Sequence, residues 1–130
     1  MSTTQPIRSK QLLHDFKEYY LTKQPNSRNY TLILIGLNTA LRINDILHLT
    51  WGDVYCTEHS RFYTHLLITE KKTEKETRIL INRELQETLL SYRKTQTSIA
   101  DTDYLFPSPR KADSPLSRYQ AYRIVRKAAE

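Results

Sequence analysis

The sequence predicts an α+β fold that is mainly α-helical and contains one small antiparallel β-hairpin or sheet. Apolar residues recur at the three- and four-residue spacing of a helix along most of the chain. Between residues 62 and 81 the period changes, and two short runs rich in β-branched and aromatic residues flank a charged stretch. Helices are therefore expected to form the body of the domain, with the hairpin as an addition to it.

The first predicted helix begins at Lys10, with Ser9 as its cap, and ends before the Gln-Pro-Asn-Ser break at 24–27. Residues 1–9 precede it as a polar arm that we expect to be flexible. One face of this helix is apolar and is predicted to point inward: Leu12, Leu13, Phe16, Tyr19 and Tyr20.

A second predicted helix, 29–40, is almost entirely apolar. Its apolar residues are Leu32, Ile33, Leu34, Ile35 and Leu37. A helix with so little polar surface is expected to lie at the centre of the core. A short third helix is predicted over 43–49.

The predicted hairpin has strands at 62–69 and 77–81, and its charged tip spans 70–76. Asn82 then caps a helix that reaches about residue 92, and Ser117 caps a last helix over 118–129. The leucines of the first of these helices that are predicted to point inward are Leu85, Leu89 and Leu90. Between the two helices lie a linker, a short buried anchor and a Pro- and Ser-containing loop, at 95–103, 104–107 and 108–115.

The charge balance favours a polyanionic partner, since Lys and Arg number 20 against 14 Asp and Glu, a net charge of +6. The single cysteine, Cys56, excludes an intrachain disulfide and a cysteine metal cluster, and it suits a reduced compartment. With 2 glycines the chain has no Gly-rich phosphate loop, and no segment is apolar enough to span a membrane. We therefore expect a cytoplasmic protein that uses no metal and no small-molecule cofactor.

The most informative stretch, 39–54, reads Thr-Ala-Leu-Arg-Ile-Asn-Asp-Ile-Leu-His-Leu-Thr-Trp-Gly-Asp-Val. It resembles the first arginine box of the tyrosine recombinases, the phage integrase family. The usual form of that box is Thr-Gly-Leu-Arg-x-x-Glu/Asp followed by Leu-x-Leu-x-Trp-x-Asp. Ala40 replaces the usual glycine, and Asp45 takes the acidic position. The other residues that fall where the family has them are Leu41, Arg42, Leu49, Trp51 and Asp53.

The resemblance implies that Arg42 is a catalytic residue. Arginine suits phosphoryl transfer because its planar guanidinium stays charged and donates two parallel hydrogen bonds to a phosphate whose charge grows in the transition state. Asp45 follows at helical spacing and is predicted to support Arg42 by orienting the guanidinium. Two alternatives remain open: Arg42 is a surface arginine paired with Asp45, or Asp45 caps neighbouring backbone.

Glu-Lys-Lys-Thr at 70–73, where the first predicted strand ends, looks like the family's β-hairpin, in which a lysine precedes threonine. The resemblance implies that Lys72 is the general acid for the leaving 5′-oxygen of the DNA. A mobile ammonium that reaches the scissile phosphate meets this demand. The alternative is a solvated run of charges at a hairpin tip. Lys71 and Lys75 are the near-neighbour alternatives for the role of general acid, and we expect both to contact DNA.

The family's second box, His-x-x-Arg, and the nucleophilic tyrosine that follows it are not found in the sequence, because no histidine has arginine at the third position after it. Tyr119 and Tyr122 are interpreted as part of the helix that leads into that box, and not as nucleophiles. The resemblance therefore identifies 10–130 as a partial catalytic domain with no nucleophile in this chain, which we expect to be inactive alone.

The last predicted helix is basic, and we expect it to contact the phosphates of duplex DNA. The candidate DNA-binding residues on it are Arg118, Arg123, Arg126 and Lys127. A solvated helix face is the alternative.

The expected function is that of a DNA-binding fragment of a site-specific recombinase or integrase, associated with the nucleoid. In the complete family, DNA strands are cleaved and rejoined through a 3′-phosphotyrosine. One alternative is a non-catalytic DNA-binding regulator that uses 43–49 as a recognition helix. Another is a self-associating module, in which a second copy or a missing C-terminal segment covers apolar faces of the second helix.

Overall fold

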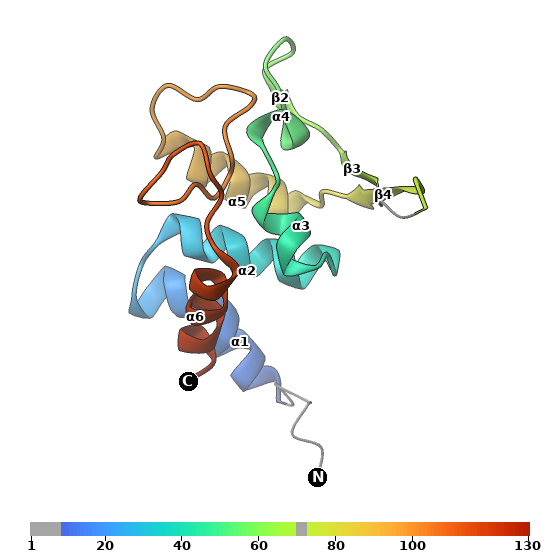
Figure 1. The fold of residues 1–130 in the computed structure, drawn as a ribbon. Coiled ribbons are helices and arrows are strands. Elements are labelled where there is room, and N and C mark those ends of the chain that lie inside the picture. Colours follow the sequence, from blue (N-terminus) through green and yellow to red (C-terminus); the bar gives the residue numbers. More distant parts are fainter. Residues whose placement is uncertain (1–8, 70–72) are drawn as a thin grey trace.

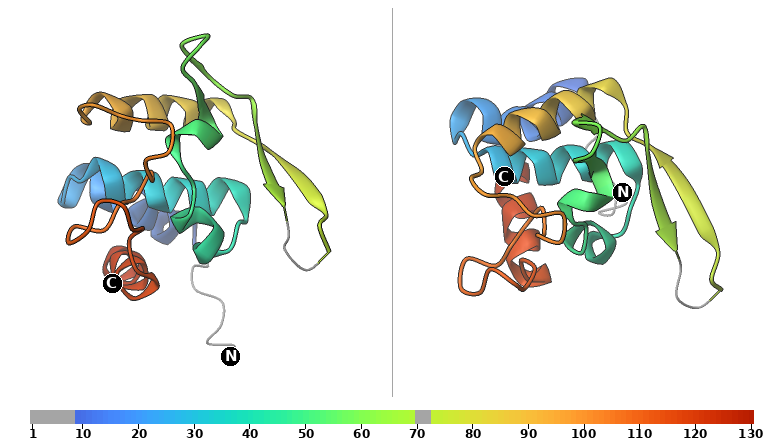
Figure 2. Two further views of the ribbon diagram at one scale, coloured as in Figure 1. Left: turned by 45° about the horizontal axis from the view of Figure 1, so that its top comes forward. Right: turned by 90° about the horizontal axis from the view of Figure 1, so that it is seen from above.

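The computed structural model describes residues 9–69 and 73–130. Its centre is helix α2 (Ser27–Thr39), with α5 (Arg83–Lys94) packed along one side and α6 (Arg118–Ala129) on the opposite side (Figures 1 and 2). Two small antiparallel pairs of strands are added to this helical body. The mainly helical α+β fold is therefore confirmed.

Helix α1 (Lys10–Glu18) begins as predicted, because the Ser9 side chain accepts a hydrogen bond from the Leu12 amide at 3.0 Å. It continues as one turn of π-helix, η1 (Tyr19–Lys23). The inward face is correct at this end, where Tyr20 is buried. It is wrong for Leu12 and Leu13, which are 57% and 43% exposed, because the core contacts only the later part of the segment.

The central position of α2 is confirmed, since the four consecutive residues from Leu32 to Ile35 are all buried. The helix begins at Ser27, slightly earlier than predicted, with the Asn26 side chain as its cap. Leu37, one of the apolar residues of this predicted core helix, is 44% exposed. Successive residues of a helix point in different directions, so a long apolar run must place some side chains away from the core.

The region after α2 is divided more finely than predicted. The helix expected over 43–49 ends earlier, as α3 (Ile43–Leu47), and a second short helix follows, α4 (Trp51–Val54). A small hairpin that the sequence did not predict comes next. Its strands, β1 (Tyr55–Cys56) and β2 (Arg61–Phe62), have two residues each.

The predicted hairpin is present as β3 (His65–Thr69) and β4 (Glu76–Leu80), paired antiparallel with Leu67 opposite Arg78. Its first strand starts three residues later than predicted, because Phe62 pairs within the smaller hairpin. Figures 1 and 2 show the β3–β4 hairpin projecting away from the helices. Leu66 and Ile81 are buried at its base, so its foot is fixed in the core.

Helix α5 begins after Asn82, whose side chain accepts a hydrogen bond from the Leu85 amide at 2.9 Å, as predicted. Leu85 and Leu89 are buried, but Leu90 is 43% exposed, which corrects its inward assignment. Residue 90 lies one position beyond the face that carries 85 and 89, and Tyr92 fills the next buried place on that face.

The expected buried anchor is confirmed, because Leu105 and Phe106 are fully buried. The Tyr92 hydroxyl donates a hydrogen bond to the Leu105 carbonyl at 2.5 Å, and burial raises the pKa of Tyr92 to about 12.

Helix α6 has its predicted bounds, since the Ser117 hydroxyl accepts a hydrogen bond from the Gln120 amide at 3.1 Å. Within 9–69 and 73–130, no helix is long and apolar enough to cross a membrane.

Candidate nucleic-acid interface

Arg42 stands at the junction of α2 and α3. The chain leaves α2 through Ala40, whose left-handed backbone (φ 57°, ψ 20°) reverses its direction. Arg42 then caps α3 with its backbone carbonyl, which accepts hydrogen bonds from the amides of Asp45 and Ile46 at 3.0 and 3.1 Å. Leu41 and Ile43, on either side, pack partly against the core. The backbone of Arg42 is therefore fixed while its side chain is exposed.

The guanidinium of Arg42 forms no hydrogen bond or ion pair with any of the residues that the structure describes. Asp45 is half-buried on the first turn of α3 and meets Arg42 through its backbone amide, not through its carboxylate. The surface ion pair between these two side chains is therefore not formed here. Arg42 presents a free cationic fork to solvent, and the supporting role of Asp45 stays a prediction.

The rest of the arginine box is structural. Leu49 and Trp51 are buried, and the Asp53 carboxylate caps α4 by accepting a hydrogen bond from the Thr50 amide at 2.8 Å. The amides of Trp51 and Gly52 donate to the carbonyls of Asp103 and Asp101 at 2.9 and 2.8 Å. These hydrogen bonds join the segment after α5 to α4. Of the five matched positions, 41, 42, 49, 51 and 53, Arg42 is the one that is both cationic and exposed.

Two of the three predicted hairpin lysines, Lys71 and Lys72, lie outside the described residues. Lys75 is exposed directly before β4. The foot of the hairpin is closed by a hydrogen bond from the Ile81 amide to the Thr64 carbonyl at 2.8 Å. The hairpin is thus anchored at its base, and Lys75 lies at the end of β4 that is opposite this base.

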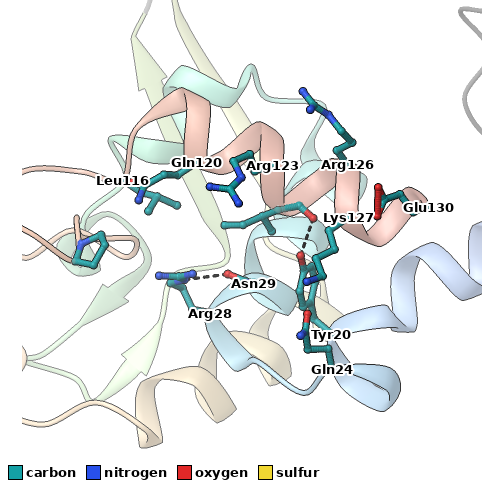
Figure 3. Close-up of a pocket in the computed structure, with 12 residues that line it drawn as sticks. Tyr20, Gln24, Arg28, Asn29, Leu116, Gln120, Arg123, Arg126, Lys127 and Glu130 are labelled. Atoms are coloured by element: carbon teal, nitrogen blue, oxygen red, sulfur yellow. Dashed lines mark hydrogen bonds between the residues drawn. The ribbon is translucent and has the colours of Figure 1, made fainter.

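The four predicted cations of α6, Arg118, Arg123, Arg126 and Lys127, are all exposed. Arg123, Arg126 and Lys127 line a cavity of about 520 Å³ between α6, η1 and the start of α2, and Arg118 does not (Figure 3). Arg28 of α2 also lines this cavity and was missed by the sequence analysis. The sequence offered no signal for it, since its approach to α6 depends on the tertiary fold.

The two tyrosines near the end of the chain are solvent-exposed on α6, Tyr119 at 69% and Tyr122 at 50%. The Tyr119 ring lies 5.8 Å from the Arg123 guanidinium carbon. In the part of the chain that the structure describes, no three His, Cys, Asp or Glu side chains are grouped to hold a metal ion.

A profile of the phage integrase family matches residues 4–130, so the chain belongs to that family, the tyrosine recombinases. It is 43% identical over 129 residues to "Probable integrase/recombinase YoeC" of Bacillus subtilis (strain 168), a match that covers 99% of this chain and 65% of that protein. The crystal structure of XerA recombinase has the same fold, with a TM-score of 0.70 at 20% identity, covering 93% of this chain and 41% of the XerA chain. The chain thus spans about two thirds of the length of its curated relative.

Proposed function

We propose that this chain supplies the DNA-binding surface and the first catalytic arginine of a site-specific tyrosine recombinase or integrase acting on duplex DNA. The observation that carries the proposal is Arg42, whose backbone is fixed at the start of α3 while its guanidinium is exposed and unpaired among the described residues. Family membership supports the assignment, because the sequence around Arg42 resembles the family's first arginine box.

In the proposed reaction a tyrosine oxygen attacks a DNA phosphorus, a phosphorus–oxygen bond to the tyrosine forms, and the bond to the 5′-oxygen breaks. Negative charge grows on the non-bridging oxygens of the phosphate during this exchange. The Arg42 guanidinium donates hydrogen bonds to those oxygens. Asp45, on the first turn of α3, orients the guanidinium once DNA is bound.

Lys72 is proposed as the general acid that gives its ammonium proton to the leaving 5′-oxygen. The hairpin suits delivery of a proton donor, since its foot is fixed in the core by Leu66 and Ile81 and its body projects beyond the helices (Figure 2). Lys71 and Lys75 flank this position and are proposed to contact the DNA backbone.

The remaining backbone contacts are proposed for α6, through Arg118, Arg123, Arg126 and Lys127. Contacts of this kind position a protein on a duplex without reading its sequence. Each releases counterions, so affinity falls with added salt. The proposal therefore predicts binding with little sequence preference.

A fluorescence anisotropy titration of a labelled duplex at several salt concentrations tests the proposal. The logarithm of the association constant should fall linearly with the logarithm of salt concentration, by about 0.9 for each phosphate neutralised. Binding absent at low salt, or unchanged by added salt, would overturn it. A second duplex of unrelated sequence should bind with similar affinity.

A regulator that uses α3 as a recognition helix fits less well, because α3 has 5 residues and buries Ile46 and Leu47.

Self-association has a specific observation in its favour, the exposed leucines on the outer face of α1 and η1: Leu12, Leu13 and Leu21. The partner would be a second copy or a further segment of the family's catalytic domain. Sedimentation at micromolar concentration distinguishes a monomer from a self-associating chain.

We propose that the protein works in the cytoplasm, associated with the nucleoid.

A further inference from the structure

The cavity between η1, the start of α2 and α6 is strongly cationic. Four of its lining side chains are positive, and Glu130 is the single acidic side chain among the described residues that line it. The four are Arg28, Arg123, Arg126 and Lys127. Figure 3 shows Arg28 and Arg123 reaching toward this space from two different helices. Cations from separate elements that line one cavity give it a positive potential, which attracts an anion.

Two hydrogen bonds support the wall that η1 and α2 form. The Tyr20 hydroxyl, buried in this wall, donates a hydrogen bond to the Ile124 carbonyl of α6 at 2.8 Å. The buried Asn29 is held at the start of α2, where its amide donates to the Asn26 side chain at 3.0 Å. A π-helical turn, which η1 is, often marks a functional site.

Arg28 is oriented by this wall. Its Nε donates a hydrogen bond to the Asn29 side-chain oxygen at 2.9 Å, which fixes the plane of the guanidinium. Among the residues that the structure describes, none accepts a hydrogen bond from its two Nη groups. A guanidinium held through Nε with both Nη groups available is arranged for an oxyanion.

Arg28 and Arg42 stand near opposite ends of α2. The 13 residues of this helix span about 20 Å at 1.5 Å per residue. Phosphates on one DNA strand rise about 3.4 Å per base pair, so this span equals about six base pairs. Helix α6 contacts both α3 and η1, which places a basic surface between the two arginines.

We propose that this cavity holds phosphates of the DNA backbone several base pairs away from the phosphate at Arg42, and that Arg28 is a DNA-contacting residue. The inference rests on the proposed function and deepens it by adding a second backbone site. A small free anion would need only one cation pair, whereas four cations along a groove of about 520 Å³ suit a chain of phosphates.

The experiment uses the whole chain and compares three variants in the same salt-dependent titration with duplex DNA. Arg28→Gln removes the charge and the fork, Arg28→Lys keeps the charge only, and Arg83→Gln is the matched control. Arg83 is exposed at the start of α5, and α5 lies on the side of α2 away from α6 (Figure 1). Arg28→Gln should bind more weakly and lower the salt slope by about 0.9, and Arg28→Lys should restore the slope. Arg83→Gln should match the unmodified chain.

A second measurement needs no substitution. Phenylglyoxal modifies accessible arginines, and mass spectrometry locates the modified sites. Duplex DNA should protect Arg28 and Arg123 and leave Arg83 reactive, and polyglutamate at the same charge concentration should protect less.

The outcomes separate the two proposals. If the chain binds DNA with a salt-dependent affinity, but Arg28→Gln behaves as Arg83→Gln and Arg28 is not protected, the cavity assignment is wrong and the proposed function stands. If duplex DNA neither binds nor protects, the proposed function fails together with the cavity assignment. Protection by polyglutamate alone would overturn the assignment to DNA and indicate an acidic protein partner.

Discussion

The hydroxyl of Tyr20 donates a hydrogen bond to the backbone carbonyl of Ile124 at 2.8 Å, which joins η1 to α6 across 104 positions of the chain. Both residues are buried, so the phenol of Tyr20 is shielded from solvent. Burial accordingly raises the pKa of Tyr20 above its ordinary value. This hydrogen bond holds α6 against η1 and thereby helps to position the cationic side chains of α6.

Tyr20→Phe should therefore lower the free energy of unfolding by about 1 kcal/mol, the net value of one buried hydrogen bond. The Ile124 carbonyl lies inside a helix and keeps its intrahelical partner, so the loss should not be larger. Urea unfolding followed by circular dichroism measures it. Tyr119→Phe, at an exposed position of α6, is the control and should change stability by less than about 0.5 kcal/mol. Equal losses in the two variants would contradict the assignment.

Ala40→Gly should stabilise the fold. Ala40 has φ 57° and ψ 20°, a left-handed conformation that costs an L-residue roughly 1–2 kcal/mol and glycine very little. Glycine loses more backbone entropy on folding, which offsets part of this, so the expected net gain is about 0.5–1 kcal/mol. The same substitution within α6, Ala121→Gly, should destabilise the chain, because that alanine is helical and buried. Two effects of the same sign would show that the backbone at residue 40 is misassigned.

The pair Lys17 and Glu84 predicts a pH dependence of stability. Lys17 Nζ donates to Glu84 Oε2 at 2.6 Å, and this hydrogen bond lowers the pKa of Glu84 and raises that of Lys17. A lowered carboxyl pKa stabilises the fold above the ordinary pKa, about 4.3, and that stabilisation is lost as the pH falls through the lowered value. The raised pKa of Lys17 contributes below its ordinary value, about 10.4, and is lost as the pH rises through the raised value.

Glu84→Gln should thus reduce stability at pH 7 by at most about 1 kcal/mol, since both side chains are partly exposed (32% and 45%). The difference from the unmodified chain should shrink as the pH falls below about 4.3 and close once the carboxylate is protonated in both the folded and the unfolded state. Urea midpoints at pH 7 and at a pH well below the ordinary carboxyl pKa measure it, with Glu87→Gln on the same helix as the control. A difference of the same size at both pH values would exclude the ion pair as its cause.

The helices at 83–94 and 118–129 were predictable because their caps are local. Asn82 and Ser117 each satisfy an amide three residues further on, so the sequence alone marks where the helix begins. Exposure was less predictable, as Leu12 and Leu90 show: each lies on an apolar stretch, but the elements that cover one side and not the other are distant in sequence.

The candidate site divides in the same way. Arg42 was found because its box is a continuous motif, and the structure places it at an exposed helix start. Arg28 was missed because it belongs to no motif. It becomes a candidate only because the fold places it in the same cavity as Arg123. The division of 43–54 into α3 and α4 also depends on distant contacts, since Trp51 and Gly52 bond to backbone that follows α5.

Arg42→Lys should separate catalysis from binding. Lysine keeps the positive charge and loses the bidentate fork, so the affinity of this chain for duplex DNA should be almost unchanged. In an enzyme that also supplies the second arginine and the nucleophile, cleavage should slow by at least about 10²-fold, the loss of roughly 3 kcal/mol. Anisotropy measures the first quantity and single-turnover cleavage of a nicked duplex the second. Cleavage at nearly the unmodified rate would remove Arg42 from the catalytic set.

The chain of 130 residues should not cut or join DNA by itself, although it belongs to a family that does. The chemistry needs a nucleophile, at least two cationic donors around the phosphate, and a proton donor for the leaving oxygen. Arg42 and Lys72 are the proposed donor and acid, and the sequence holds no His-x-x-Arg box to provide a second arginine. Groups that act as a unit retain little rate when part of the set is absent.

A nicked suicide duplex tests this expectation, because the cleaved strand diffuses away and any phosphotyrosine link is trapped. No covalent protein–DNA adduct should appear on a denaturing gel, even though Tyr119 and Tyr122 are exposed on α6 near the proposed phosphate contacts. Arg123, the cation beside Tyr119, lies 5.8 Å from its ring and lines the cavity shared with Arg28. An adduct that disappears in Tyr119→Phe or Tyr122→Phe would show that α6 carries the nucleophile, and that the active site is built from residues interpreted here as part of the DNA-binding helix.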